Sequence, residues 1–326
     1  MMRQTADGSR TVAIAGANGM VGRHLVEALL ARGDRVIALV RSPASYRFPP
    51  SVDVRRWQAS DPLAPVDEAD VVVNLVGDPI FAKRWTQIRK QELIHTRVLA
   101  TCSLVESIRK AGGQGHTLIS STAIEYAGNT GDRQVDETAA PGKGFLAELS
   151  KLWEAEAQRV NETGARLMLL RQSLVLGREG GVLAGLLLLY RWGFGGTLGP
   201  GGQWISWIHV NDAARLILHA IDHETITGPL ISASPHPVTS REFARIFAHA
   251  VGRPRLFPMS RWMMELFWGE RAALFLDSHR VVPHVALSTG FEFRFPTLEV
   301  ALAGLLGKSP LPLEQLMKQE REPDPH

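Results

Sequence analysis

The sequence has a single cysteine, Cys102, among 326 residues. One thiol excludes an internal disulfide and any zinc site built from several cysteines, and we expect no metal site of another kind. Because Cys102 lies in an apolar stretch with helical periodicity, it is expected to be a small buried core residue rather than a nucleophile. The scarcity of cysteine agrees with a reducing compartment, and we predict a cytoplasmic location.

Long apolar runs and blocks of one charge are missing as well. The most apolar run, 182–190, is too short to span a bilayer, and residues 1–10 lack the apolar core of a signal peptide. The net charge is +3 and the Lys and Arg residues are scattered, so the sequence has no basic stripe for nucleic acid. We therefore expect neither a membrane nor a nucleic acid as partner, and disordered tails at 1–10 and 311–326.

What the chain does contain is a regular alternation of strand and helix patterns up to about residue 172. This alternation predicts an α/β fold of Rossmann type, with a doubly wound parallel sheet, over 11–172. From residue 173 the pattern is mixed, and we predict a smaller mixed α/β substrate lobe over 173–310, partly interleaved with the sheet. The predicted strands are 11–15, 35–40, 52–56, 70–75, 116–120, 166–170 and 205–210, and the main predicted helices are 24–31, 85–111, 145–163 and 182–192.

Three glycines, Gly16, Gly19 and Gly22, lie between the first strand and the first helix. In this context Gly16 permits a tight turn, Gly19 lets a pyrophosphate approach the backbone, and Gly22 lets helix and strand pack closely. The start of the helix offers free N–H groups to phosphates. The loop therefore predicts a bound dinucleotide, and the loop residues expected to contact it are Gly16, Asn18, Gly19, Met20, Val21 and Gly22.

The end of the second strand indicates which dinucleotide is bound. An acidic residue there would bind the ribose hydroxyls of NAD, but the strand ends in Val40 and Arg41 without a carboxylate. Arg41 can pair with a 2′-phosphate, so we predict NADP(H) as the cofactor. Arg23, just past the third glycine, either contributes to this site or is an ordinary solvated helix residue.

A resemblance to a known family rests on stretches spread over almost the whole chain, from Thr11 to Leu306. The chain resembles the atypical, extended branch of the short-chain dehydrogenase/reductase superfamily, and within it the YfcH-like epimerase family. This implies an oxidoreductase or epimerase with a nicotinamide cofactor and a small-molecule substrate. The matching stretches are 74–77, 84–85, 96–98, 120–126, 145–147, 153–154, 199–212, 280–283 and 290–293.

The resemblance also implies catalytic positions. In the wider superfamily a Ser or Thr orients the substrate, a Tyr transfers the proton, and a Lys four residues later lowers the pKa of that Tyr. Here Thr122 and Lys151 take the first and last positions, but the tyrosine position falls on Ala147, which cannot exchange a proton. Tyr126 is the remaining candidate, or it is a residue packed under its loop. His209 is expected to be structural or to line the pocket.

Further cofactor contacts are implied by the strand order and the resemblance. Extended members usually carry at position 97 an Asn that braces the fourth strand, and Arg97 is expected to brace backbone carbonyls there. Glu92 is expected to pair with Arg97 or to touch the ligand. The alternative is that Glu92 and Arg97 only form an ion pair within the helix, without a role at the cofactor. The other residues implied at the cofactor are Leu75, Val76, Gly77, Ser120 and Val175.

Three functions agree with these features. The first is an NADP(H)-dependent oxidoreductase or epimerase-like enzyme acting on an unidentified small substrate. The second is a cofactor-binding regulator without turnover, suggested by Ala147 and by a plant chloroplast-division protein in the same family. The third is a nucleotide-sugar epimerase, which would need a tightly held NAD and a proton-transferring Tyr. Helices 85–111 and 145–163 are expected to pair two copies in a homodimer.

Overall fold

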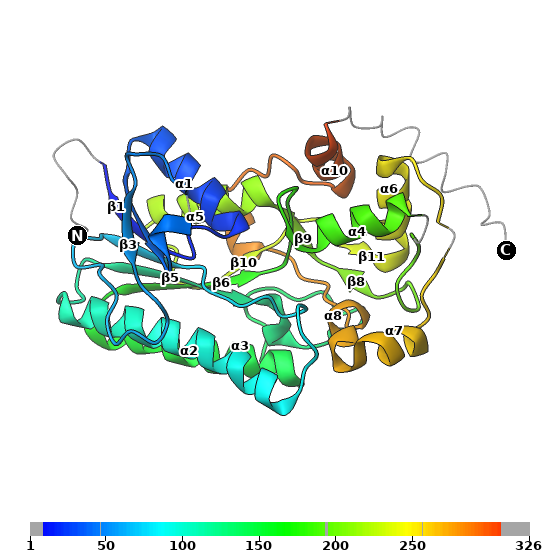
Figure 1. Ribbon diagram of the computed structural model, residues 1–326, viewed down its shortest axis with the longest axis horizontal. Coiled ribbons are helices and arrows are strands. Elements are labelled where there is room, and N and C mark those ends of the chain that lie inside the picture. The colour runs from blue at the N-terminus through cyan, green and yellow to red at the C-terminus, as the bar shows by residue number, and fades with distance from the viewer. Residues whose placement is uncertain (1–8, 46, 193–194, 256, 308–326) are drawn as a thin grey trace.

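The computed structural model describes residues 9–45, 47–192, 195–255 and 257–307. The predicted tails at 1–10 and 311–326 lie outside the described residues, except for Ser9 and Arg10. Seven strands form one parallel sheet in the order β10-β6-β5-β4-β1-β2-β3 (Figure 1). This confirms the predicted doubly wound fold. The strands are β1 (Thr11–Ala15), β2 (Arg35–Val40), β3 (Asp53–Arg56), β4 (Val71–Asn74), β5 (Thr117–Ala123), β6 (Arg166–Gln172) and β10 (Gly228–Ser232).

Helices cover both faces of this sheet. Helices α2 (Gln87–Lys110) and α3 (Phe145–Gln158) lie side by side on one face, and α1 (Met20–Arg32) and α5 (Val210–Asp222) lie on the other (Figure 1). Alternate residues of β1 enter the two cores, Val12 and Ile14 on the α1 side and Ala13 on the α2 side. The central strands read as continuous apolar runs because both of their faces are buried.

The helix ends depart from the predicted ranges for local reasons. Helix α2 begins at Gln87 because the side chain of Thr86 accepts a hydrogen bond from the backbone N–H of Arg89. The predicted helix 145–163 is α-helical to Gln158 and ends in a 3-10 turn, Arg159–Thr163. Cys102, expected to be buried, is only half-buried on α2, and burial raises the pKa of its thiol, so it is protonated at neutral pH.

The region after 173 forms a smaller lobe around its own core, which includes Trp207, Phe247 and Leu302. Its strand pairs are β7 (Leu174–Leu176) with β9 (Trp207–His209), and β8 (Trp204–Ile205) with β11 (Val238–Thr239). The predicted strand 205–210 is split at Ser206, whose hydroxyl turns away to bond the backbone at His279 and Val281. The helices are α4 (Gly181–Arg191), α6 (Ser240–Val251), α7 (Arg261–Trp268), α8 (Ala273–Leu276), α9 (His284–Ser288) and α10 (Leu298–Leu306).

Two buried carboxylates fasten the C-terminal segment 277–297 across the sheet domain. Asp212, at the start of α5, accepts hydrogen bonds from the backbone N–H groups of Arg294 and Phe295. Glu137, in the loop after β5, accepts from Val285 and from β10. A short parallel bridge between Val135 and Val281 lies beside them. The smaller lobe is therefore tied to the loop that follows β5.

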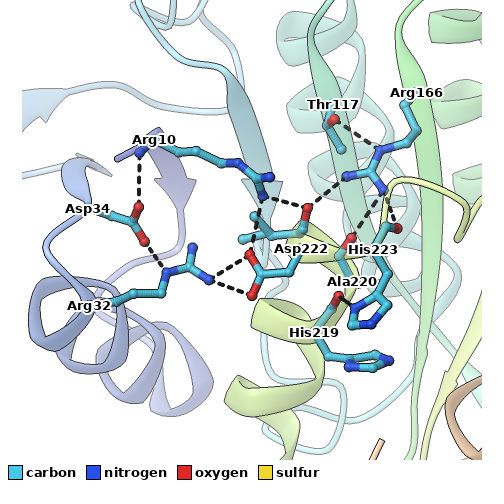
Figure 2. A network of polar contacts seen from close by, with 10 residues as sticks. Arg10, Arg32, Asp34, Thr117, Arg166, His219, Ala220, Asp222 and His223 are labelled. Carbon is cyan, nitrogen blue, oxygen red and sulfur yellow. Dashed lines mark hydrogen bonds and ion pairs between the residues drawn. The ribbon is translucent and has the colours of Figure 1, made fainter. Parts of the chain in front are cut away.

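An arginine network lies at the edge of the sheet where the strands begin (Figure 2). Arg10 and Arg166 donate to carbonyl oxygens at the C-terminal end of α5, where cations are favourable. Arg32 binds both carboxylate oxygens of Asp222. Arg10, predicted to belong to the tail, is thus part of the folded domain.

Among the described helices, none is long and apolar enough to cross a membrane.

Candidate functional site

The glycine loop forms a corner where backbone meets backbone. Gly16 has φ +85°, and a Cβ on it would lie 2.9 Å from the carbonyl oxygen of Leu75. A Cβ on Gly22 would overlap the carbonyl oxygen of Gly16. Gly19 differs, because its φ of −70° and ψ of 169° suit any residue and its Cβ would approach only the Gly16 oxygen, at 3.2 Å. Gly16 and Gly22 are therefore required by the fold, whereas Gly19 leaves open space before α1.

Helix α1 begins at this corner without a side-chain cap from the described residues. Its first residues, Met20 and Val21, are half-buried, and Asn18 is exposed. Arg23 donates from Nε to the carbonyl oxygen of Asn18, at 3.0 Å, so it fastens the loop. The N–H groups of the first turn face the space beside Gly19, and such a helix start is a binding site for phosphate.

The end of β4 forms the floor of the site. Leu75 donates its N–H to the carbonyl of Ala15. Asn74 is fully buried; its Nδ2 donates to Thr101 at 3.0 Å and to Ser120 at 3.4 Å, and its Oδ1 accepts from Val76 at 3.2 Å. Ser120 is fully buried, so its position supports the floor from below. No role for Asn74 was predicted from the sequence, although it opens the matched stretch 74–77.

Arg97 braces the chain just beyond this floor. Its guanidinium donates to the carbonyl oxygens of Asp78, at 2.8 Å, and of Leu93, at 3.1 Å. Burial lowers the pKa of Arg97 to about 10, so it stays charged at neutral pH. The expected pair with Glu92 is wrong, because Arg97 turns inward beneath Gly77 and Glu92 pairs instead with Arg89, at 3.0 Å.

The end of β7 forms the wall opposite the glycine loop. Val175 pairs with Ile208 in the two-stranded sheet, and the Met20 side chain of α1 packs directly against Gly177. The glycine loop, residues 75–77 and the end of β7 thus converge at one edge. They meet at the carboxyl ends of the parallel strands, where open α/β sheets bind ligands.

Two exposed arginines lie at the ends of the neighbouring strands β2 and β3, at the same edge of the sheet. Arg41 comes directly after β2, whose last residue, Val40, is buried. Arg56 is the last residue of β3 and lies opposite Val40 in the strand register. The sequence pointed to Arg41 but not to Arg56, because the register of two strands cannot be read from one sequence.

Beneath the predicted catalytic positions lies a buried ion pair between Glu154 of α3 and Arg171 of β6. Arg171 donates from Nε and Nη2 to the two carboxylate oxygens, at 2.8 and 3.0 Å. The hydroxyl of Thr122 donates to Glu154 at 3.1 Å. The Arg171 guanidinium lies 3.8 Å from the ring centre of Tyr126. Thr122 and Tyr126 are thus joined through one network, in which Tyr126 is packed against a cation.

Lys151 is not part of this network. Its ammonium forms an ion pair with Glu148, at 2.8 Å, and its side chain is 42% exposed. Glu148 lies in the first turn of the same helix, so the lysine is held on the outer side of α3. The structure therefore brings together two of the three residues predicted to be catalytic.

A cavity of about 250 Å³ opens beside Ala147, the position that the resemblance assigns to the proton-transferring tyrosine. The residues that line it come from the loop before α2, the loop after β5, the start of α3, the region of α8 and the C-terminal segment. They include Trp85, Glu125, Lys143, Phe145, Ala147 and His279. Ala147 itself is buried. A substrate-sized space therefore lies between the sheet domain and the C-terminal segment.

Comparison with known proteins assigns the family. The model of the NAD dependent epimerase/dehydratase family matches residues 12–230. The chain belongs to this family. A domain of unknown function, DUF1731, matches 259–305, which includes the segment that closes the cavity.

Relatives match over nearly their full lengths. Epimerase family protein YfhF of Bacillus subtilis is 33% identical over 90% of this chain and 97% of its own. A chloroplastic SDR39U1 homolog of Arabidopsis thaliana is 33% identical over 91% of this chain and 86% of its own. The crystal structure of human SDR39U1 with NADPH is 30% identical, with a TM-score of 0.82 over 92% of this chain and all of that one. The resemblance seen in the sequence is confirmed, and the predicted cofactor agrees with the NADPH of the human relative.

His209 caps helix α5 beside the end of β7. Its Nδ1 accepts a hydrogen bond from the backbone N–H of Asn211, at 3.1 Å, and its ring stacks on Phe295 at 3.6 Å. Burial lowers the pKa of His209 to about 4, against the opposing effect of Asp212. The ring is therefore neutral in the folded protein at neutral pH and acts as a structural cap.

The buried ion pair yields a first prediction. Removal of Glu154 in Glu154→Ala leaves Arg171 charged and unpaired in the interior, and we expect the free energy of unfolding to fall by about 3–5 kcal/mol. Replacement of both partners by Leu and Met restores much of this loss. Lys151→Ala, which breaks an exposed pair, is the control and should cost less than about 1 kcal/mol. Urea unfolding measures all three, and equal losses in the two single variants would contradict the prediction.

His209 yields a second prediction, on pH. The unfolded chain binds a proton at His209 near the ordinary pKa of 6.5, whereas the folded chain does so only near 4. Stability is therefore lost as the pH falls through this window, by up to about 3 kcal/mol. His209→Asn keeps a capping acceptor but cannot titrate. Its unfolding free energy should fall less between neutral pH and about pH 4.5, and parallel curves for the two proteins would refute the assignment.

Proposed function

We propose that the chain binds NADP(H) along the carboxyl edge of the sheet and uses it to reduce or oxidise a small carbonyl or hydroxyl compound in the cavity beside Ala147. The observation that carries this proposal is the corner at Gly16, Gly19 and Gly22. There the backbone leaves room for a diphosphate against the uncapped start of α1. When bound, the nicotinamide supplies or accepts a hydride.

The residues of the site fit this cofactor. The open space beside Gly19 suits the diphosphate, and the floor at Leu75–Gly77 is held rigid by Asn74 and Arg97. The exposed guanidinium of Arg41, with Arg56 on the adjacent strand, suits a 2′-phosphate, because Arg binds phosphate with two parallel hydrogen bonds. The NADPH bound to the human relative supports the same choice.

Thr122 is restricted to one role in this chemistry. Its hydroxyl hydrogen is donated to Glu154, so only the lone pairs of its oxygen remain for a substrate. Thr122 is buried and is not one of the residues that line the cavity, so its proposed contact is limited to accepting a hydrogen bond from a substrate hydroxyl that reaches past Ala147. The donor to a substrate carbonyl must come from another residue.

A direct test is titration of the purified chain with NADPH and with NADH, in which cofactor fluorescence measures binding. We expect NADPH to bind at least about tenfold more tightly than NADH. Arg41→Ala should remove most of that preference and leave NADH binding unchanged, because NADH has no 2′-phosphate. Gly19→Ala should weaken both dinucleotides with only a small change in melting temperature, since φ and ψ at this position suit any residue and the added methyl group meets only the Gly16 oxygen, at 3.2 Å. Lys110→Ala, on the exposed end of α2, is the control. A chain that binds neither dinucleotide would refute the proposal.

A second candidate function is a cofactor-binding regulator without turnover. Two observations favour it: the buried Ala147 offers no proton donor, and Lys151 is held away by Glu148. A nucleotide-sugar epimerase is less well supported. A cavity of about 250 Å³ with Glu125, Glu270 and Asp277 in its walls is small and unfavourable for a diphosphate.

Turnover separates the enzyme from the regulator. With a panel of aldehydes and ketones, we expect the enzyme to oxidise NADPH, and Thr122→Ala to abolish that reaction while NADPH still binds. Thr122→Ser, which keeps the hydroxyl, is the matched control and should retain activity. NADPH binding without oxidation of any compound in the panel would favour the regulator.

Two coarser expectations remain proposals. For the homodimer, α2 and α3 lie side by side on one face (Figure 1), with Ile88 70% and Leu152 40% exposed. Apolar side chains exposed on adjacent helices support pairing of two copies. For the location, the Arabidopsis relative is chloroplastic by name, and a cytoplasmic location stays a prediction for this chain.

A further inference from the structure

The cavity beside Ala147 has one apolar wall. The rings of Trp85 and Phe145 meet edge to face, with centres 5.0 Å apart. The indole N–H of Trp85 donates to the carbonyl oxygen of Ile80, at 2.9 Å. The ring therefore presents only carbon surface to a ligand. Ala147 continues this wall. A compound with an apolar body fits against it.

The cavity is also lined by a histidine with unsatisfied hydrogen bonding, His279. This residue is 7% exposed. Its two ring nitrogens are shielded from solvent, and neither has a hydrogen-bond partner in the part of the chain that the structure describes. A neutral imidazole has one donor and one acceptor, and leaving both buried and unpaired is unfavourable. The backbone of His279 is nevertheless fixed, because its N–H donates to Trp204 and its carbonyl accepts from Ser206.

Two of the carboxylates around the cavity are bound by neighbouring side chains. Glu270 pairs with Lys90 of α2, and Asp277 accepts from Asn129. The cavity walls hold three carboxylates, Glu125 among them, and one lysine. This balance disfavours an anion and leaves His279 as the buried polar group with hydrogen bonds still to make.

We propose that this cavity is the substrate site, that it takes a small uncharged ketone, aldehyde or alcohol with an apolar body, and that the His279 ring turns toward the cavity to hydrogen-bond to the ligand oxygen. The proposal rests on the proposed function and names its substrate class. It also assigns a role to the C-terminal domain of unknown function, which supplies His279 and closes the cavity over Ala147.

The test uses the full chain without cofactor, with isotopically labelled histidine. The NMR signals of the histidine rings are the readout. The probes are acetophenone, benzyl alcohol and benzoate, which have similar sizes and differ in charge. We expect acetophenone and benzyl alcohol to shift the His279 signals saturably, and benzoate to bind about tenfold more weakly. The exposed His236 serves as the internal control and should not respond.

Two variants separate a ligand contact from a structural role. His279→Phe keeps an aromatic ring of similar shape and should weaken acetophenone binding about tenfold, the value of one hydrogen bond. His279→Gln keeps a donor and an acceptor and should recover binding at least in part, and it replaces the Phe variant if that one does not fold. His236→Phe is the matched control, and its affinity should equal that of the parent.

The outcomes separate this inference from the cofactor proposal. A His279 response to the uncharged probes, reduced in His279→Phe, supports the inference whether or not NADPH binds. Absence of any response, or benzoate binding as tightly as acetophenone, overturns it while NADPH binding can still stand. Equal acetophenone affinity in the parent and in His279→Phe also overturns it.

Discussion

The buried pair of Glu154 and Arg171 connects the parts of this protein that the proposed chemistry needs. Two charges in the interior are tolerated only when nearly all of their hydrogen bonds are made. Arg171 therefore binds both oxygens of Glu154 and also the carbonyl of Glu137. Glu137 in turn accepts from the C-terminal segment at Val285. Helix α3, strand β6, the loop after β5 and the C-terminal segment are thus held in one fixed relation around the cavity.

The features that could be predicted from the sequence are those with local causes. Apolar runs at 11–15 and 70–75 become central strands because both faces of such strands are buried, and the glycine loop needs only its neighbours in sequence. The seventh strand, β10, was not predicted, and neither was the position of Arg56 beside Arg41 at the site. Their positions depend on which strands become neighbours, and one sequence contains no record of that register. The Glu154–Arg171 pair is hidden for the same reason.

Rotation around a helix accounts for the errors at the side-chain level. Residues 92 and 97 are five positions apart, which places them on different sides of α2, whereas 89 and 92 are three apart and face each other. Glu92 therefore pairs with Arg89, and Arg97 turns toward the backbone at Asp78. On α3, Lys151 and Glu148 are likewise three apart. The resemblance assigned Lys151 to a catalytic position, but its ammonium forms an ion pair with Glu148 on the same helix instead.

The absence of a tyrosine at 147 changes where a hydrogen-bond donor can come from. In this chain the start of α3 contributes Phe145, Leu146 and Ala147 to the cavity, none of which has a polar side chain, and the hydroxyl of Thr122 already donates its hydrogen bond to Glu154. A donor elsewhere in the cavity is useful only if its position is fixed to a fraction of an ångström. The C-terminal segment meets this requirement, because Asp212 and Glu137 anchor it by backbone hydrogen bonds and Ser206 holds the carbonyl of His279 itself. In the proposed site, substrate recognition would thereby depend on a segment that lies outside the dinucleotide-binding sheet and that buried carboxylates fasten to it.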